Sequence, residues 1–360
     1  VSAPSCRMAP TIKWISIKVI PTHYTPLITA ALKAQGADLN APRQIAQAVR
    51  KLSDHYINNP DSATPWHTDW AKIAYVAYFF PLNYLRVSAV LRAGMRSGFW
   101  QGLTEFSDFG SGLGTVPLAI ADSLPGQFLR GLAVESSPVT EKIYKQLAQA
   151  DLAHPNLSWA TKLAPAAKSS GHLTVFSFSL TELPELPKAA LASEALAIIE
   201  PATHQDGRRL MQLRADLMAQ GWYAWAPCTH QEACPLLVES ARDWCHDRIT
   251  WEPPEWYLAI EEHLPMRNRT LTHSYLLMRR QPPPIASFTV ARLTGDLQRQ
   301  KGASKQMVCR GPKREFLSWQ HKHGQVPEWP RGALVRLSSD IAVKSNELRP
   351  TPDQCDLVGC

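Results

Sequence analysis

Between residues 101 and 279, short apolar segments alternate with stretches of helical character. Each apolar segment has the length of a strand and is bounded by glycine, proline or polar residues. Chains that alternate in this way form a mostly parallel sheet covered by helices. The segments are "LTEFSDF", "GLAVES", "LTVFSFS", "ALAIIEP", "GWYAWAP" and "HSYLLMRR". The sequence therefore predicts an α/β fold for this part of the chain.

The residues before this region have a helical pattern. In "APRQIAQAVRKLSDHY" the apolar residues recur at helical spacing and predict one buried face, formed by Ile45, Val49, Leu52 and Tyr56. A second helical pattern covers residues 67–94. Pro81 lacks an amide hydrogen, so we expect it to kink or divide this second segment, as in a helical hairpin.

The chain changes character again after the proline run "RRQPPP" at residues 279–284. Segments such as "ASFTVARL", "KQMVCRG" and "GALVRLSS" predict a small β-rich unit. We therefore expect three parts: a helical part at 1–100, the α/β part at 101–284 and a β-rich extension at 285–360.

A glycine loop follows the first predicted strand. In "SDFGSGLGT", Gly110, Gly112 and Gly114 would let the backbone approach a ligand at the carboxyl edge of the sheet. Asp108 ends that strand, and Glu135 ends the next one, where an acid can accept the two hydroxyls of a ribose. The spacing resembles motif I of class I methyltransferases, which bind S-adenosylmethionine. An ordinary tight turn and a nicotinamide oxidoreductase are the alternatives, although the G-x-G-x-x-G spacing of the latter is missing.

Seven cysteines occur in a chain without a secretion signal, which favours metal binding or burial over disulfides. Cys228, Cys234 and Cys245 have the spacing C-x5-C-x10-C, unlike a C-x2-C zinc ribbon or a redox pair. Cys309 is the natural fourth ligand, since four thiolates close a tetrahedral zinc site or hold a cubane iron–sulfur cluster. The alternative is that these cysteines are buried without a ligand.

The other metal-ligating side chains are expected to have lesser roles. His230 and His246 flank the central cysteines and are predicted to be loop residues rather than ligands. Cys6, Cys355 and Cys360 lie near the termini in sequence without a regular pattern, and we assign them no role.

The whole net charge of +7 falls between Arg279 and the end of the chain, with fourteen Lys or Arg against seven Asp or Glu. Within this region "CRGPKREFLSWQHKHG" interleaves basic and aromatic side chains, which favours phosphate neutralisation beside base stacking. The alternative is a solvated basic face with the aromatic rings in a core. The residues concerned are Arg310, Lys313, Arg314, Phe316, Trp319 and Lys322.

The N-terminal composition and the apolar runs bear on localisation. Four basic residues precede the first acid, Asp38, as in a transit peptide, but no Arg-rich amphipathic helix is present, so chance composition is favoured. The longest apolar run, "IAYVAYFFPLNYL", is too short to span a bilayer. We expect a soluble, cytoplasmic protein, with the mitochondrial matrix as the alternative. The basic residues are Arg7, Lys13, Lys18 and Lys33.

Several motifs together resemble one family. "IAYVAYFFPLNYLRVSAVL", "DFGSGLGT", "LAIIEPAT", "APCTHQEACP", "WCH" and "VCR" occur in the order seen in the small-ribosomal-subunit methyltransferase-like proteins. This is the family of methyltransferase-like protein 17 of animal mitochondria and its fungal and bacterial relatives. The resemblance covers roughly residues 66–349.

The resemblance implies a class I, Rossmann-like methyltransferase fold that acts on the small ribosomal subunit or its rRNA, with no membrane or DNA partner. It implies a four-iron four-sulfur cluster, with zinc as the alternative, on Cys228, Cys234, Cys245 and Cys309. It also implies an S-adenosylmethionine site at Asp108, Gly110, Ser111, Gly112, Gly114 and Glu135.

The fourth predicted strand ends in "SFSLTEL" and lacks the Asn- or Asp-Pro-Pro-aromatic motif with which amino-methyltransferases hold an exocyclic amine. Cytosine C5 methylation would need a nucleophilic cysteine, and the central cysteines are better explained as ligands. No catalytic residue is therefore assigned, and Glu182 is expected only in the pocket wall. Two hypotheses follow: an rRNA methyltransferase, or a non-catalytic assembly factor that binds rRNA.

Overall fold

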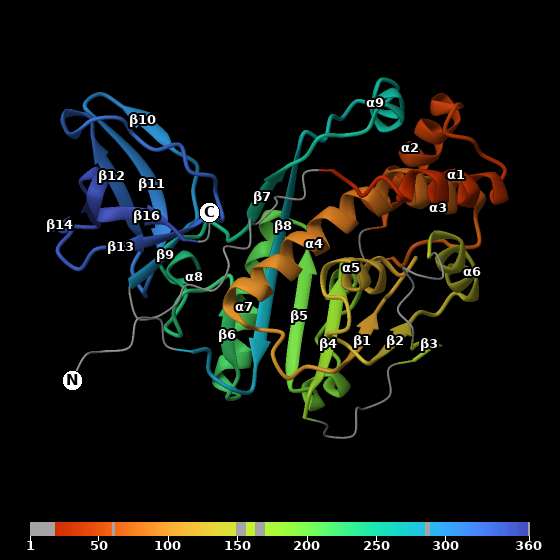
Figure 1. Cartoon of the computed structure of the whole chain (residues 1–360), viewed down its shortest axis with the longest axis horizontal. Coiled ribbons are helices and arrows are strands. Elements are labelled where there is room, and N and C mark those ends of the chain that lie inside the picture. The colour runs from red at the N-terminus through yellow and green to blue at the C-terminus, as the bar shows by residue number, and fades with distance from the viewer. Residues whose placement is uncertain (1–18, 60–61, 149–155, 163–169, 285–288, 359–360) are drawn as a thin grey trace, which may run out of the picture.

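The computed structural model describes residues 19–59, 62–148, 156–162, 170–284 and 289–358. They form a central sheet with helices on both faces, a group of N-terminal helices, and a separate C-terminal β-unit at the opposite end of the molecule (Figure 1). The basic N-terminal residues Arg7, Lys13 and Lys18, together with Cys6 and Cys360, lie outside the described residues.

The central sheet has the strand order β3-β2-β1-β4-β5-β8-β6, with β7 paired to β8. The first five strands in this order run parallel, whereas β8 is antiparallel to its neighbours β5 and β6. This arrangement confirms the predicted α/β fold. The strands are β1 Glu105–Phe109, β2 Arg130–Val134, β3 Leu157–Ala160, β4 His172–Ser177, β5 Ala195–Glu200, β6 Tyr223–Ala226, β7 Asp247–Thr250 and β8 Thr270–Arg279.

The sheet separates two hydrophobic cores. Along β5, Leu196 and Ile198 point into one core, and Ala197 and Ile199 point into the other. Both faces of this strand are buried, which explains its continuous apolar sequence. The helices that follow the first strands are α5 Thr115–Ser123, α6 Pro138–Leu147 and α7 His204–Ala219. The short helix α8 Pro235–Val238 contacts α7, and α9 Glu255–Glu261 lies beside α2, away from the sheet (Figure 1).

The N-terminal helices lie on the side of the sheet toward which β4 and β5 point (Figure 1). The predicted helix with Ile45, Val49 and Leu52 on its buried face is confirmed. Residues of these helices belong to the same core as the sheet residue Leu173. The predicted boundaries between the parts, at residues 100 and 284, stay predictions. The helices are α1 Tyr24–Ala34, α2 Pro42–Asn58, α3 Asp69–Ala74 and α4 Phe80–Ser97.

The expected hairpin at Pro81 is wrong. A π-helical turn, Tyr75–Phe79, joins α3 to α4, and the backbone stays helical throughout. Pro81 is the second residue of α4, directly after the π-helical turn, whose wider register accommodates a residue without an amide hydrogen. None of the described helices combines the length and apolar character that crossing a membrane requires.

The C-terminal β-unit has the strand order β14-β15-β12-β11-β9-β13-β16 and its own core. Trp319 is 3% exposed in that core, so the expectation that it stacks on RNA is wrong. Cys355 is also 3% exposed and begins a strand, so it does not lie in irregular sequence. The strands are β9 Thr289–Leu293, β10 Gln298–Gln300, β11 Ala303–Cys309, β12 Glu315–Gln320, β13 Leu334–Leu337, β14 Ala342–Lys344, β15 Glu347–Arg349 and β16 Cys355–Leu357.

Candidate functional sites

The glycine loop joins β1 to α5 at the carboxyl edge of the sheet. The amides of Gly110 and Ser111 donate to the carbonyl oxygen of Val134 over 2.9 and 3.1 Å, which ties the loop to the end of β2. Gly110 has φ +69°, and a Cβ atom there would lie 2.5 Å from the Cβ of Ser179. Only glycine fits this position, which keeps the end of β1 close to the segment after β4.

Two carboxylates adjoin the loop. Asp108 is 1% exposed and accepts a hydrogen bond from the Ser111 hydroxyl over 2.7 Å. Burial, with a smaller effect of Glu135, raises the pKa of Asp108 to about 7, although the Ser111 hydrogen bond opposes the shift. Glu135 accepts from the amide of Gly112 over 3.1 Å and from the amide of Ser137 over 3.0 Å.

The structure therefore gathers the sequence-predicted cofactor residues at one strand edge. Asp108, Ser111 and Glu135 contact one another or the loop, and Gly114 caps the start of α5. The carboxyl edges of β1 and β2 thus carry two acids beside a glycine loop, an arrangement that suits a nucleoside ligand. Binding of S-adenosylmethionine by these residues stays a prediction.

The segment after β4 forms the neighbouring wall. Phe178 has φ +58°, a strained conformation for a residue with a side chain, and such strain clusters at functional sites. Glu182 lies on a 3-10 turn, and burial, followed by the charge of Glu135, raises its pKa to about 7. Glu182 thus interacts with Glu135 at the glycine loop, and its place in a pocket wall stays a prediction.

Glu200 and Arg209 hold this segment, and sequence reasoning gave neither of them a role. Glu200, the acid of the "EPAT" motif, accepts from the amide of Leu180 over 2.9 Å. Arg209 donates to the carbonyl oxygens of Leu180 and Leu183. The signal that could have revealed Glu200 is an acid at the end of a strand that is otherwise entirely apolar.

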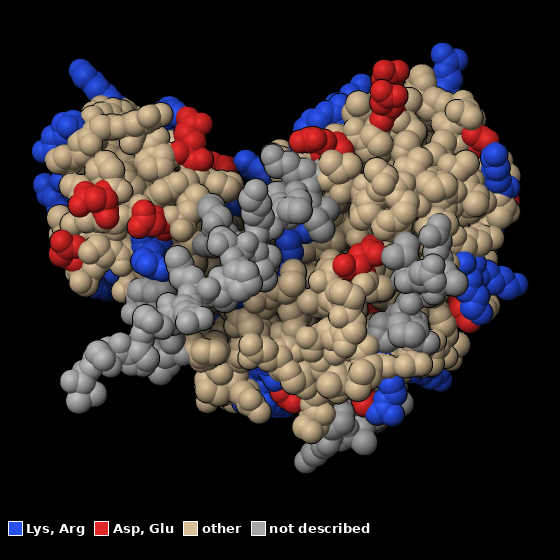
Figure 2. All heavy atoms as spheres, in the orientation of Figure 1, with Lys and Arg blue, Asp and Glu red and all other residues tan. Residues whose placement is uncertain are grey.

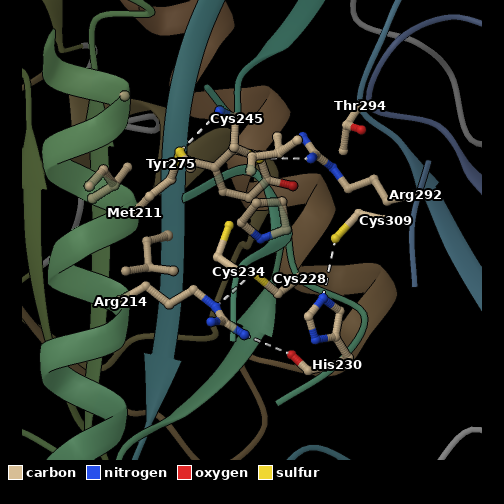
Figure 3. A pocket seen from close by; sticks show the side chains of 15 residues that line it. Met211, Arg214, Cys228, His230, Cys234, Cys245, Tyr275, Arg292, Thr294 and Cys309 are labelled. Atoms are coloured by element: carbon tan, nitrogen blue, oxygen red, sulfur yellow. Dashed lines mark hydrogen bonds between the residues drawn. The ribbon is translucent and has the colours of Figure 1, made fainter. Parts of the chain in front are cut away.

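The four central cysteines line one cavity (Figure 3). Cys228 follows β6, Cys234 precedes α8, Cys245 precedes β7, and Cys309 ends β11 of the C-terminal β-unit. The cysteines predicted to act together are thus brought together from two parts of the chain. In the part of the chain that the structure describes, no three His, Cys, Asp or Glu side chains form a group that could hold a single metal ion.

Three side chains donate to, or contact, the cysteine sulfurs. Arg214 Nε donates to Cys228 Sγ over 3.1 Å, and Arg292 Nη1 donates to Cys245 Sγ over 3.1 Å. His230 Nε2 lies 3.2 Å from Cys309 Sγ (Figure 3). Arg214 is held by the carbonyl oxygens of His230 and Glu232, and Arg292 is held by Asp247.

Sequence reasoning missed both arginines because lone basic residues are usually solvated. Arg214 and Arg292 are each 3% exposed. His230 belongs to a loop, as expected, but its ring faces the cavity, whereas His246 stacks on Trp244 at 5.2 Å between ring centroids.

Burial disfavours the thiolate form in this cavity. Burial, together with the neighbouring sulfurs of Cys228 and Cys245, raises the pKa of Cys234 to about 11. Burial also raises the pKa of Cys245, although the Arg292 guanidinium opposes the shift. Burial and the charge of Arg214 lower the pKa of His230 to about 4, so its imidazole is neutral. Thiolates here would need the positive charge of a bound metal group.

The predicted basic surface is partly used inside the molecule. Arg310 pairs with Glu315 at 2.8 Å, and Arg314 pairs with Asp243 at 2.8 Å. Lys313 and Lys322 remain exposed. Figure 2 shows Lys and Arg spread over the C-terminal β-unit with Asp and Glu among them, and a notch between this unit and the rest of the molecule.

The strand order, the single antiparallel strand between β5 and β6, and the glycine loop with an acid at the end of β2 define a class I, Rossmann-like methyltransferase fold. Residues 69–316 match the family described as mitochondrial small ribosomal subunit Rsm22. The chain belongs to this family, which confirms the resemblance to small-subunit methyltransferase-like proteins. No curated protein matches the chain.

Solved structures with partial likeness include several methyltransferases. TrmK of M. capricolum, in complex with S-adenosyl-homocysteine, is 8% identical, with a TM-score of 0.33 over 54% of this chain and 71% of that one. Precorrin-6y C5,15-methyltransferase of Geobacter metallireducens is 12% identical, with a TM-score of 0.33 over 52% and 87%. The METTL16 methyltransferase domain is 11% identical, with a TM-score of 0.33 over 56% and 69%. Likeness at this level adds nothing to what the strand order already defines.

Proposed function

We propose that the protein is an S-adenosylmethionine-dependent methyltransferase that acts on the rRNA of the small ribosomal subunit. The observation that carries this proposal is the contact between Glu135 and Gly112, because it places a carboxylate at the glycine loop where a ribose would bind. The family description, which names the small ribosomal subunit, supports the choice of substrate.

The residues have separable roles in this proposal. The backbone of the glycine loop would lie against the methionine part of the cofactor, and Glu135 would accept its ribose hydroxyls. The bound cofactor supplies an electrophilic methyl group. Glu182, with its pKa near neutrality, is the side chain best suited to take a proton from the target base.

Calorimetry with S-adenosylmethionine tests the cofactor site, and transfer of labelled methyl groups to purified small subunits tests the reaction. We expect binding by the native chain and its loss in Glu135→Ala. Absence of binding by the native chain would contradict the enzyme hypothesis.

A second function, a non-catalytic assembly factor that binds rRNA, is favoured by the "SFSLTEL" segment, which offers no amide or Asp-Pro-Pro group for a target amine. In that case the glycine loop is dispensable. Complementation of a deletion strain with Gly112→Asp separates the two functions: normal subunit maturation supports the assembly factor, and defective maturation supports the enzyme.

The cysteine cavity supports a four-iron four-sulfur cluster on Cys228, Cys234, Cys245 and Cys309. The four thiols line a single cavity between the sheet and the C-terminal β-unit. Two buried guanidinium groups donate to the sulfurs and would offset the net negative charge of a thiolate-ligated cluster. Iron and acid-labile sulfide near four each per chain, after purification without oxygen, would support the cluster. One zinc ion without sulfide would contradict it.

The exposed lysines of the C-terminal β-unit support contact with rRNA. In salt titrations of RNA binding, log affinity falls linearly as log salt rises, and this line becomes less steep by about 0.7–0.9 for each phosphate contact that is lost. Lys313→Gln and Lys322→Gln should each make the line less steep, whereas Lys51→Gln on α2 should leave it unchanged. The family description favours the mitochondrial matrix over the expected cytoplasm, and cell fractionation tests this assignment.

A further inference from the structure

An aromatic face from the N-terminal helices lies against the glycine loop. A Cβ atom placed on Gly112 would lie 3.4 Å from Cζ2 of Trp66. The ring centroids of Trp66 and Tyr75 are 4.8 Å apart, and those of Tyr75 and Phe79 are 5.8 Å apart. We call these three rings the aromatic face. It covers the same glycine that Glu135 contacts.

The π-helical turn supplies two of the three rings. Tyr75 begins this turn and Phe79 ends it, and both side chains are half-buried. A π-helical turn is rare and is found mostly at functional sites, because the wider turn shifts side chains out of the normal helical register. Here it presents both rings on one side of a helix whose other residues are mostly buried.

Two carboxylates lie beside this aromatic face. Glu135 holds the amide of Gly112 over 3.1 Å. Burial, followed by Tyr56, Glu182 and Glu135, raises the pKa of Tyr75, and a hydrogen bond with Asn83 opposes the shift. Among the ion pairs of the described residues, none includes Glu135 or Glu182.

Arg86, a cationic side chain that interacts with Tyr75, is engaged elsewhere. Arg86 donates to Asn83 Oδ1 over 2.9 Å and to the carbonyl oxygen of Thr272 over 3.1 Å. Its guanidinium lies over the Phe178 ring at 5.6 Å. None of the cation–π contacts among the described residues involves Trp66, Tyr75 or Phe79.

We infer that Trp66, Tyr75 and Phe79 form a wall of the cofactor site and select the sulfonium cation of S-adenosylmethionine over the uncharged thioether S-adenosylhomocysteine. This inference rests on the proposed function. Aromatic faces attract organic cations through the ring quadrupole, and the attraction is larger where water is excluded. The carboxylate of Glu135, which contacts Gly112, adds to it.

The selection has a consequence for turnover. When the methyl group leaves, the sulfur keeps the bonding electron pair and becomes a neutral thioether, while the target base loses a proton. The aromatic face then holds the product less strongly than the substrate. The N-terminal helices thus favour product release as well as cofactor binding.

Calorimetric titration of the full chain with both compounds tests the inference. The native chain should bind S-adenosylmethionine about 5- to 30-fold more tightly than S-adenosylhomocysteine, as a cation–π contact of ordinary strength allows. Tyr75→Leu and Trp66→Leu should bring this ratio close to one, with S-adenosylhomocysteine affinity changed about twofold or less. Tyr75→Phe should keep the ratio, because the ring remains.

Trp70→Leu is the matched control, since this ring contacts His55 and not the glycine loop. Thermal unfolding identifies variants that fail to fold. If the leucine variants fail to fold, cofactor binding is measured instead by quenching of tryptophan fluorescence in Tyr75→Phe and Trp66→Phe. Quenching by S-adenosylmethionine should disappear in Trp66→Phe. Binding of both compounds with an unchanged ratio in the leucine variants would overturn this inference alone. Absence of all binding by the native chain would overturn the proposed function with it.

Discussion

Arg292 Nη1 lies 3.1 Å from Cys245 Sγ and joins the C-terminal β-unit to the sheet domain at the cysteine cavity. Arg292 belongs to β9, is 3% exposed and also pairs with Asp247. Cys309 reaches the same cavity from β11. The attachment of the β-unit and the chemistry of the cavity therefore depend on the same few contacts.

Replacement of a cavity cysteine should destabilise the protein, because the free energy of cluster binding is part of the folding free energy. We expect Cys234→Ser to lose iron and to lower the unfolding temperature, by about 2–4 °C for each kcal/mol lost. Amide hydrogen exchange in β9 and β11 should accelerate. Cys355 is buried in the β-unit away from the cavity, so the control variant Cys355→Ser should keep its iron. An unchanged unfolding temperature of metal-free Cys234→Ser protein would refute the expected destabilisation.

Arg292→Met should be more harmful than an ordinary loss of charge. It removes the donor to Cys245 and leaves Asp247 in the interior without its partner, and breaking a buried pair in this way costs about 3–5 kcal/mol. Chemical denaturation and iron retention after dialysis measure both effects. Arg349→Met is the control, because Glu347 keeps its contact with Lys305 there. Equal losses in the two variants would argue against a special role for Arg292.

Gly110→Ala should weaken cofactor binding through the shape of the loop. Its new Cβ would meet Ser179 at 2.5 Å, and φ +69° adds backbone strain of about 1–2 kcal/mol. Gly126→Ala has the same type of strain at φ +74° but meets nothing within 4 Å. We expect calorimetry to show lost cofactor affinity only in Gly110→Ala. Similar affinity in both variants would mean that the close approach of loop and Ser179 is unimportant.

Glu200 should make the stability of the protein depend on pH. Burial raises its pKa to about 8, with Asp206 and Glu182 adding to the shift while the Leu180 amide and Arg209 oppose it. The folded state therefore holds a proton that the unfolded state has released above its ordinary pKa near 4.5. Glu200 therefore lowers the free energy of unfolding as pH rises from about 4.5 to 8, by up to about 1.4 kcal/mol for each pH unit.

Glu200→Gln tests this effect, since the amide stays neutral at every pH and can still accept from Leu180. Thermal unfolding between pH 5.5 and 8.5 should show a flatter dependence and a higher unfolding temperature in the variant at pH 8. Parallel curves for the two proteins would show that Glu200 does not hold its proton in the folded state.

The apolar segments of β4, β5 and β8 are continuous because these strands are buried along most of their length, on both faces. β3 and β7 were missed, since they are only partly buried and carry mixed side chains. Trp319 illustrates the same limit in the β-unit: its neighbours in sequence are basic, but the pleat of β12 directs its ring into the core. Local pattern does not say which face of a strand a core will cover.

The sequence by itself determined the fold class, the glycine loop with its acids, and the four cysteines, because strand length, glycine spacing and residue chemistry are local properties. Only the tertiary structure decided that Arg214 and Arg292 face the cysteine sulfurs and that Trp66 covers Gly112. These contacts join residues far apart in the chain. Their formation depends on which surfaces are buried together when the helices, the sheet and the β-unit pack, and no short segment carries that information.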